Sequence, residues 1–188
     1  MKRIASLFLS FVFVVLMATP SPALTIVRDF TGGEQGPLDI GGGNIVDIFN
    51  EAADRWEAII RDKHTLTIHY GWAPVGGGEH TFIAEEGKFG RETEAKICFN
   101  NDVKPEHMHW YLDPNPEDDS EYGSALIQEF TDLGGGMVNV ALYRSSPIGD
   151  AASFGHIDLL MVAMHEIGHA LGLSYASANF QIEGEDGT

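Results

Sequence analysis

His165-Glu166-Ile167-Gly168-His169-Ala170-Leu171-Gly172-Leu173 is the stretch of this chain with the most direct chemical meaning. On a helix, residues four apart lie on one face, so His165 and His169 can offer two imidazole nitrogens to a single zinc ion. Glu166, one step around the helix, can take a proton from a water that attacks a polarised carbonyl. The H-E-x-x-H spacing therefore predicts a zinc-dependent hydrolytic site. The alternative is a pair of histidines that pack or cap without a metal.

The residues that flank this stretch favour a buried helix. The preceding run, residues 157–164, is apolar nearly all round, which is typical of a helix in a protein interior. Gly172 lies where such a helix would end, and Ser153 is a candidate for its N-cap.

Residues 165–172 resemble the first eight positions of the metzincin signature H-E-x-x-H-x-x-G-x-x-H. Residues 97–110 are also similar to the strand and acidic loop that precede the zinc helix in matrixins, a metzincin family. The resemblance implies an α+β fold in which a twisted mixed sheet packs on two long helices, the second carrying the motif. It also implies a zinc metalloendopeptidase that acts on protein or peptide substrates. The sequence departs from the signature at the third His, where it has Tyr175.

The signature therefore does not identify the third zinc ligand. A phenol with a pKa near 10 is a poor ligand, so Tyr175 is a weak candidate, whereas a shell of two His and one carboxylate is established for catalytic zinc. Of the carboxylates that follow, we prefer Glu183, because Phe180 and Ile182 could hold that segment against the domain. A ligand beyond Thr188 is the third alternative.

The end of the chain differs from the family pattern in a second way. Metzincins carry a Met-containing turn beneath the metal, and no Met follows Leu173 here. We therefore expect a C-terminal subdomain that is short or missing, as in a truncated chain. An alternative function follows from this expectation, namely a secreted zinc-binding adhesion or matrix module with an incomplete, inactive cleft.

The first 23 residues read as a secretory signal peptide. Lys2 and Arg3 precede an apolar run, and Ser21 and Ala23 offer the small residues that a signal peptidase reads. We expect residues 24–188 to form one catalytic domain that is secreted, extracellular or periplasmic, and not membrane-bound after cleavage. An uncleaved membrane anchor is the alternative.

The charge balance excludes some partners. The formal net charge is −17, and removal of Lys2 and Arg3 with the signal makes it about −19. Such a chain repels nucleic acid and anionic membranes. The single cysteine, Cys98, cannot form an intrachain disulfide, and its place in an apolar run predicts a buried, inert thiol. Nothing in the sequence indicates an oligomeric state.

Hydrophobic periodicity places the expected elements. Alternation predicts strands over residues 24–30, 65–72, 95–99 and 137–143, and helical spacing predicts helices over residues 44–61 and 122–133. Asn44 is a plausible cap for the first helix, and Gly76, Gly77 and Gly78 read as a flexible connection.

Two further groups of side chains are candidate metal ligands. The carboxylates of residues 113–121 allow a calcium ion, because hard cations take clusters of oxygen ligands, although an acidic Pro-rich loop is also typical of solvated surface. His107 and His109 would point to one side of an extended segment, but no companion ligand has a recognisable spacing. We interpret both histidines as surface residues.

Overall fold

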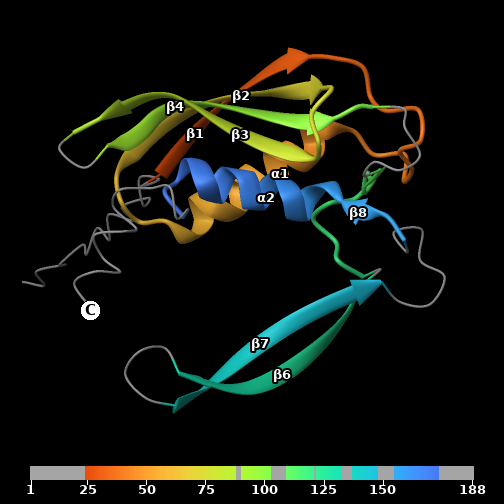
Figure 1. Cartoon of the computed structure of the whole chain (residues 1–188), viewed down its shortest axis with the longest axis vertical. Helices are drawn as coiled ribbons and strands as arrows, with labels where there is room; N and C mark the ends of the chain where they lie inside the picture. Colours follow the sequence, from red (N-terminus) through yellow and green to blue (C-terminus); the bar gives the residue numbers. More distant parts are fainter. Residues whose placement is uncertain are drawn as a thin grey trace, which may run out of the picture.

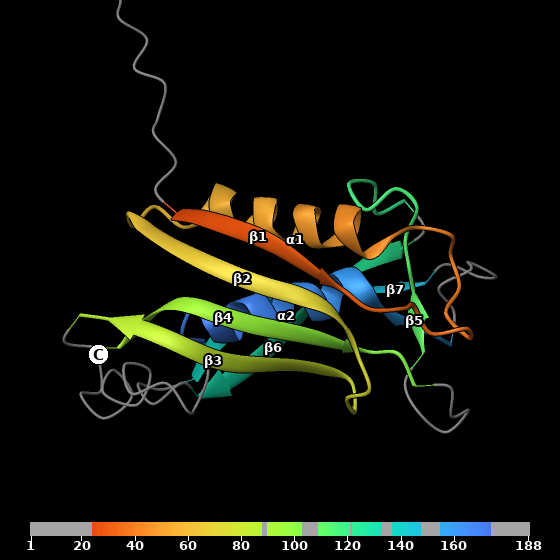
Figure 2. The same cartoon turned by 90° about the horizontal axis from the view of Figure 1, so that it is seen from above.

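A four-stranded mixed sheet forms one layer of the molecule (Figure 1). The computed structural model describes residues 24–87, 90–102, 109–120, 122–132, 137–147 and 155–173. The strands lie in the order β1-β2-β4-β3, and β3, at the edge, is the antiparallel one (Figure 2). Their bounds are β1 Leu24–Gly32, β2 His64–Ala73, β3 Gly78–Glu86 and β4 Arg91–Asn100.

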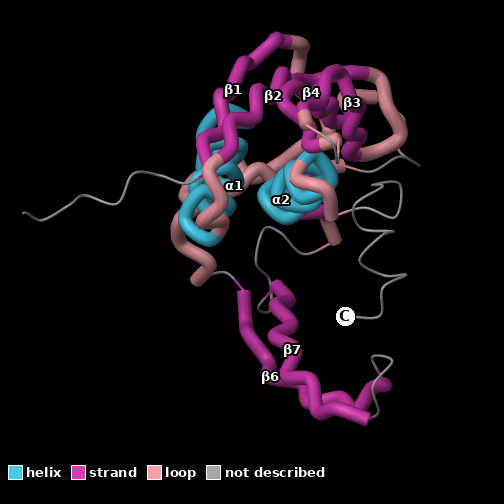
Figure 3. Tube along the Cα trace, turned by 90° about the vertical axis from the view of Figure 1, so that its left-hand side faces the viewer, coloured by secondary structure: helices cyan, strands magenta, loops and turns pink. Residues whose placement is uncertain are grey.

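Two helices, α1 (Ile45–Ile59) and α2 (Leu159–Ala170), cover the same face of this sheet. Seen end-on in Figure 3, α1 lies against β1, and α2 lies under β4 and β3. Asn44 caps α1, because its side-chain oxygen accepts a hydrogen bond from the Asp47 N–H at 2.9 Å. This confirms the predicted α+β arrangement and the predicted cap.

The core fills the space between the sheet and the two helices. The Phe49 ring of α1 stacks on the Tyr70 ring of β2 with centroids 3.8 Å apart. The helices are joined by a hydrogen bond from the Trp56 indole N–H to the Met164 carbonyl at 3.0 Å. Fully buried apolar residues of β2, β4 and both helices include Ile48, Ala52, Ala53, Leu66, Ile68, Ala95, Ile97, Phe99, Leu159 and Ile167.

The start of α2 differs from the prediction. Ile157 and Asp158 are extended and form β8 (Ile157–Asp158), which pairs in parallel with β5 (Trp110–Tyr111). The helix therefore begins at Leu159. Its N-cap is Asp158, whose carboxylate accepts from the Leu160 N–H at 2.9 Å, and not Ser153, which lies outside the described residues.

The helix predicted over residues 122–133 is wrong. Residues Tyr122–Asp132 form strand β6, which pairs antiparallel with β7 (Met137–Pro147), the strand predicted over residues 137–143. Figures 1 and 3 show this hairpin on the far side of the helices from the sheet. Pairing in register along the whole of both strands satisfies the backbone of β6, and a periodicity search within one segment does not detect such a partner.

The sequence does not predict β3, because Gly78 reads as part of a flexible connection and the following residues alternate weakly. Cys98 was predicted to be buried, but it is only partly buried. Its neighbours Ile97 and Phe99 point into the core, so alternation along β4 directs Cys98 to the other face of the sheet. Among the described residues, no helix is long and apolar enough to cross a membrane.

Candidate metal centre

His165 and His169 lie next to each other on α2, as their spacing predicts. Their ring centroids are 4.4 Å apart and the rings are nearly perpendicular, at 81°. His165 is exposed and His169 is half-buried, so this face of the helix is open to solvent and not closed by the core. Two imidazoles on one open face can supply two of the three protein ligands of a catalytic zinc ion.

The orientation of His169 is fixed by the turn that ends α2. Gly172 has a φ of +94°, a conformation that favours glycine, and its N–H donates to the His169 carbonyl at 2.9 Å. The Leu173 N–H donates to the Gly168 carbonyl at 2.9 Å, which completes a Schellman motif. The Leu173 carbonyl then accepts a hydrogen bond from His169 Nδ1 at 3.0 Å. Nε2 of His169 is thereby left for a metal.

Glu166 is buried beneath the edge strand, with a relative exposure of 7%. A Cβ added to Gly78 of β3 would lie 2.8 Å from Glu166 Oε1 and 2.5 Å from Val162 Cγ1. Any side chain at position 78 would force a neighbouring group to shift, so glycine allows β3 to cross α2 this closely. The strand partly excludes water from a carboxylate that lies one residue from His165.

His80 lies near the candidate site, although no pattern in the sequence indicates it. It follows Gly78 by two positions on β3, and its ring centroid lies 6.3 Å from that of His169. Its Nε2 is 2.8 Å from Glu92 Oε2 on β4. The signal in the sequence is one of alternation, because residues two apart on a strand share a face. This alternation points to His80 as a site residue only when β3 is known to cross α2.

The imidazole nitrogens of His165 and His169 are donor atoms that zinc prefers, although the described side chains do not form a complete coordination shell. Within the described ranges, no group of three or more His, Cys, Asp or Glu side chains is already gathered for a metal ion. Two imidazole nitrogens on one face suit zinc, and a third protein ligand is needed for a catalytic shell. Tyr175 and Glu183 both fall in residues 174–188, outside the described part of the chain.

Asp158 connects the N-terminus of α2 to the rest of the molecule. Burial raises the pKa of the Asp158 carboxyl above its ordinary value, and the hydrogen bonds from the Leu160 N–H and the Tyr122 side chain partly oppose this shift. Because the partly buried carboxylate caps the helix that bears the histidines, it helps to fix where α2 begins.

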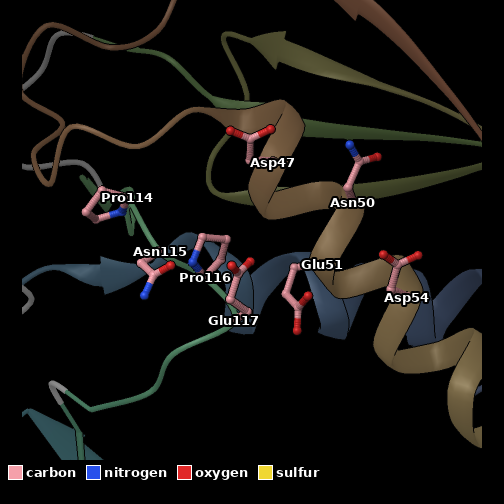
Figure 4. Close-up of a pocket in the computed structure, with 8 residues that line it drawn as sticks. All are labelled: Asp47, Asn50, Glu51, Asp54, Pro114, Asn115, Pro116 and Glu117. Atoms are coloured by element: carbon pink, nitrogen blue, oxygen red, sulfur yellow. The ribbon is translucent and has the colours of Figure 1, made fainter.

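Glu117, one of the carboxylates considered for calcium, lines a pocket between α1 and the loop after β5, together with three carboxylates of α1 that the prediction did not include (Figure 4). Asp47, Glu51 and Asp54 come from α1, and Glu117 comes from the loop. Glu51 is engaged with Arg55 at 2.7 Å, and Asp47 Oδ2 accepts from Asn44 Nδ2 at 2.5 Å. Calcium binding here stays a prediction that the geometry does not test.

His109 is half-buried and not a surface residue, which corrects the prediction, and its Nε2 is inaccessible to solvent. Its carbonyl accepts from the Ile157 N–H at 3.2 Å, so the residue is part of the β5–β8 junction. His107 lies outside the described residues.

The sheet order, the two helices on one face and the H-E-x-x-H motif on the second helix together define a metzincin-type metalloprotease fold. The matrixin family model matches residues 48–182, and the chain belongs to this family. No curated protein and no solved structure matches the chain.

Proposed function

We propose that this protein is a zinc-dependent metalloendopeptidase in which His165 and His169 bind the metal and Glu166 is the general base. One observation carries the proposal. The two imidazoles share an open face of α2 with ring centroids 4.4 Å apart, and Glu166, the residue that follows His165, is buried under β3. A bound zinc ion would polarise the peptide carbonyl and activate a water for attack.

The role of Glu166 is to accept the proton of the attacking water and to pass it to the leaving amine. His169 is held by Leu173 and needs little reorientation to bind a metal.

The edge strand β3 suggests how a peptide would be held. β3 ends the order β1-β2-β4-β3, so its outer edge has no strand partner within the described sheet. An extended peptide can add to such an edge by main-chain hydrogen bonds, with little dependence on its sequence. Because β3 crosses α2 at Glu166, and the His80 ring of β3 lies 6.3 Å from that of His169, a peptide bound along β3 would lie near the proposed metal site.

The test is a comparison of Glu166→Gln with the unaltered protein. The amide keeps the shape of the side chain but cannot take a proton, so we expect zinc content to be unchanged and cleavage of casein to fall by about 100-fold or more. Glu34→Gln, at an exposed loop position, is the matched control. Cleavage above about a tenth of the unaltered rate in Glu166→Gln would exclude the general-base role.

Zinc binding without any cleavage by the unaltered protein would favour the alternative function, a secreted zinc-binding adhesion or matrix module. Secretion itself rests on the signal peptide predicted over residues 1–23, and N-terminal sequencing of the exported protein tests that prediction. Glu183, the third ligand preferred from the sequence, is tested by zinc affinity in Glu183→Ala, with Tyr175→Phe as its counterpart.

A further inference from the structure

The third protein ligand is the part of the proposed site that the signature does not supply. A catalytic zinc is usually held by three side chains and one water, and α2 provides two imidazoles. Another element of the described fold can reach this site, an inference that rests on the proposed zinc site.

β3 is the strand that comes closest to the functional face of α2. Gly78 contacts the helix at Val162 and Glu166, and alternation places His80 on the same face of the strand. His80 is one step further along β3, and its side chain is 16% exposed. Its ring centroid lies 6.3 Å from that of His169, and the ring planes differ by 40°.

These separations can be compared with a zinc site. With zinc–nitrogen bonds of about 2.0 Å and tetrahedral angles, the centroids of two coordinated imidazoles lie about 5 Å apart. The His165–His169 separation of 4.4 Å is slightly shorter than this value, and the His80–His169 separation of 6.3 Å is slightly longer. Side-chain rotations that move the ring centroids by about 1 Å would bring both pairs to it.

Glu92 orients the His80 ring in the way that ligand histidines are oriented. A carboxylate only accepts hydrogen bonds, so His80 Nε2 donates to Glu92 Oε2 at 2.8 Å. This fixes the tautomer and leaves Nδ1 as the free lone pair. Metal-binding histidines usually donate their second nitrogen to a carboxylate or a carbonyl, and His169 has the equivalent bond to Leu173.

We propose that His80 is the third protein ligand of the zinc ion, with Glu92 as the residue that positions it. The edge strand then has two parts in the site, because Gly78 shields the base and His80 completes the metal shell. A side chain from the sheet then takes the place of the third His of the signature, where this chain has Tyr175. The ligand comes from the element proposed to hold the substrate.

The first experiment is a titration of zinc against a chelator in the full chain. We expect His80→Ala to weaken zinc binding by more than about 100-fold, and Glu92→Gln to weaken it by about 10-fold. His69→Ala is the matched control, because His69 also lies on a strand and also pairs with a carboxylate, but it faces away from the helices. Its zinc affinity should equal that of the unaltered protein.

A second experiment gives a positive signal and does not depend on lost binding. In His80→Cys loaded with cobalt, a thiolate ligand should add a charge-transfer band in the near ultraviolet, and His69→Cys should not add one. Cys98 is present in both variants and in the unaltered protein, so it contributes equally to all three spectra.

The outcomes separate this inference from the proposed function. If the unaltered protein binds no zinc, both are wrong. If zinc binding depends on His169 but His80→Ala keeps the unaltered affinity and His80→Cys shows no cobalt–thiolate band, only the assignment of His80 is wrong. Loss of zinc in Glu183→Ala together with its retention in His80→Ala would assign the third position to Glu183.

Discussion

His69 lies between two carboxylates on the face of the sheet that points away from the helices. Its Nε2 is 2.9 Å from Glu94 and its Nδ1 is 2.6 Å from Asp29. The hydrogen bond with Glu94, followed by that with Asp29, raises the pKa of His69 above its ordinary value. The folded state therefore binds the His69 proton more tightly than the unfolded state does.

The contribution of His69 to stability therefore depends on pH. The stabilisation from His69 is fully present below the unfolded pKa of about 6.5, and it is lost as the pH rises through the higher folded value. We expect urea unfolding to show a larger difference in stability between the unaltered protein and His69→Gln at pH 6 than at pH 9. An equal difference at both pH values would contradict the assignment.

Single residues also show which parts of the site a sequence can predict. His165, Glu166 and His169 are predictable because the helix itself brings residues of this spacing together. Gly78 and His80 are not, because their proximity to α2 depends on how β3 pairs with β4. That pairing is a contact between segments distant in the sequence, and no local pattern specifies it.

At the level of elements, Asp158 tests how α2 is fixed at its start. We expect Asp158→Ala to lower the free energy of unfolding by about 1 kcal/mol, because the Leu160 N–H loses its acceptor. Asp158→Asn keeps the cap and should lose much less. Thermal or urea unfolding of both variants measures the difference, and equal losses would show that the cap does not stabilise the helix.

Asp158 also makes the unfolding free energy depend on pH. Because burial raises the pKa of Asp158, the unfolding free energy should fall as the pH rises from the unfolded value, about 3.9, to the folded one. Asp158→Asn removes this decline.

The crossing of β3 over α2 gives a second test at this level. In Gly78→Ala the new methyl group would lie 2.5 Å from Val162 Cγ1, so the Val162 side chain, the strand or the helix must shift. We expect a loss of about 1–3 kcal/mol in stability, whereas Gly76→Ala, with no atom within 4 Å of its Cβ, should change stability by less than about 0.5 kcal/mol. Equal stabilities would mean that the crossing is loose.

Elements differ in how well periodicity predicts them. α1 and β2 were predicted within about two residues because each buries one clear apolar face against the other. β6 was predicted as a helix because Leu126, Ile127 and Phe130 also fit a helical spacing. Its strand conformation depends on β7, so the sequence of β6 alone is ambiguous.

For the whole molecule, the sheet and helices are joined by a small number of polar contacts in addition to the core. Arg28 of β1 pairs with Glu57 of α1 at 2.9 Å, and the Ile26 N–H donates to Glu57 at 2.6 Å. With one cysteine, the chain has no intrachain disulfide. A metal that binds only the folded state would therefore be a substantial part of its stability.

This gives a prediction for metal removal. Zinc at about 1,000 times its dissociation constant should add about 4 kcal/mol to the unfolding free energy, so a chelator should lower the melting temperature by several degrees. The double variant His165→Ala/His169→Ala should melt at the same temperature with and without chelator. A chelator effect on the double variant would show that the stabilising metal binds elsewhere, as in the pocket of Figure 4.

The central claim is that the histidine pair of α2 binds zinc, and the zinc content of the purified chain tests it most directly. After dialysis, elemental analysis should find about one zinc per chain in the unaltered protein and in His69→Ala, and almost none in His169→Ala. Zinc retained by His169→Ala at the unaltered affinity, or no zinc in the unaltered protein after loading, would contradict the claim.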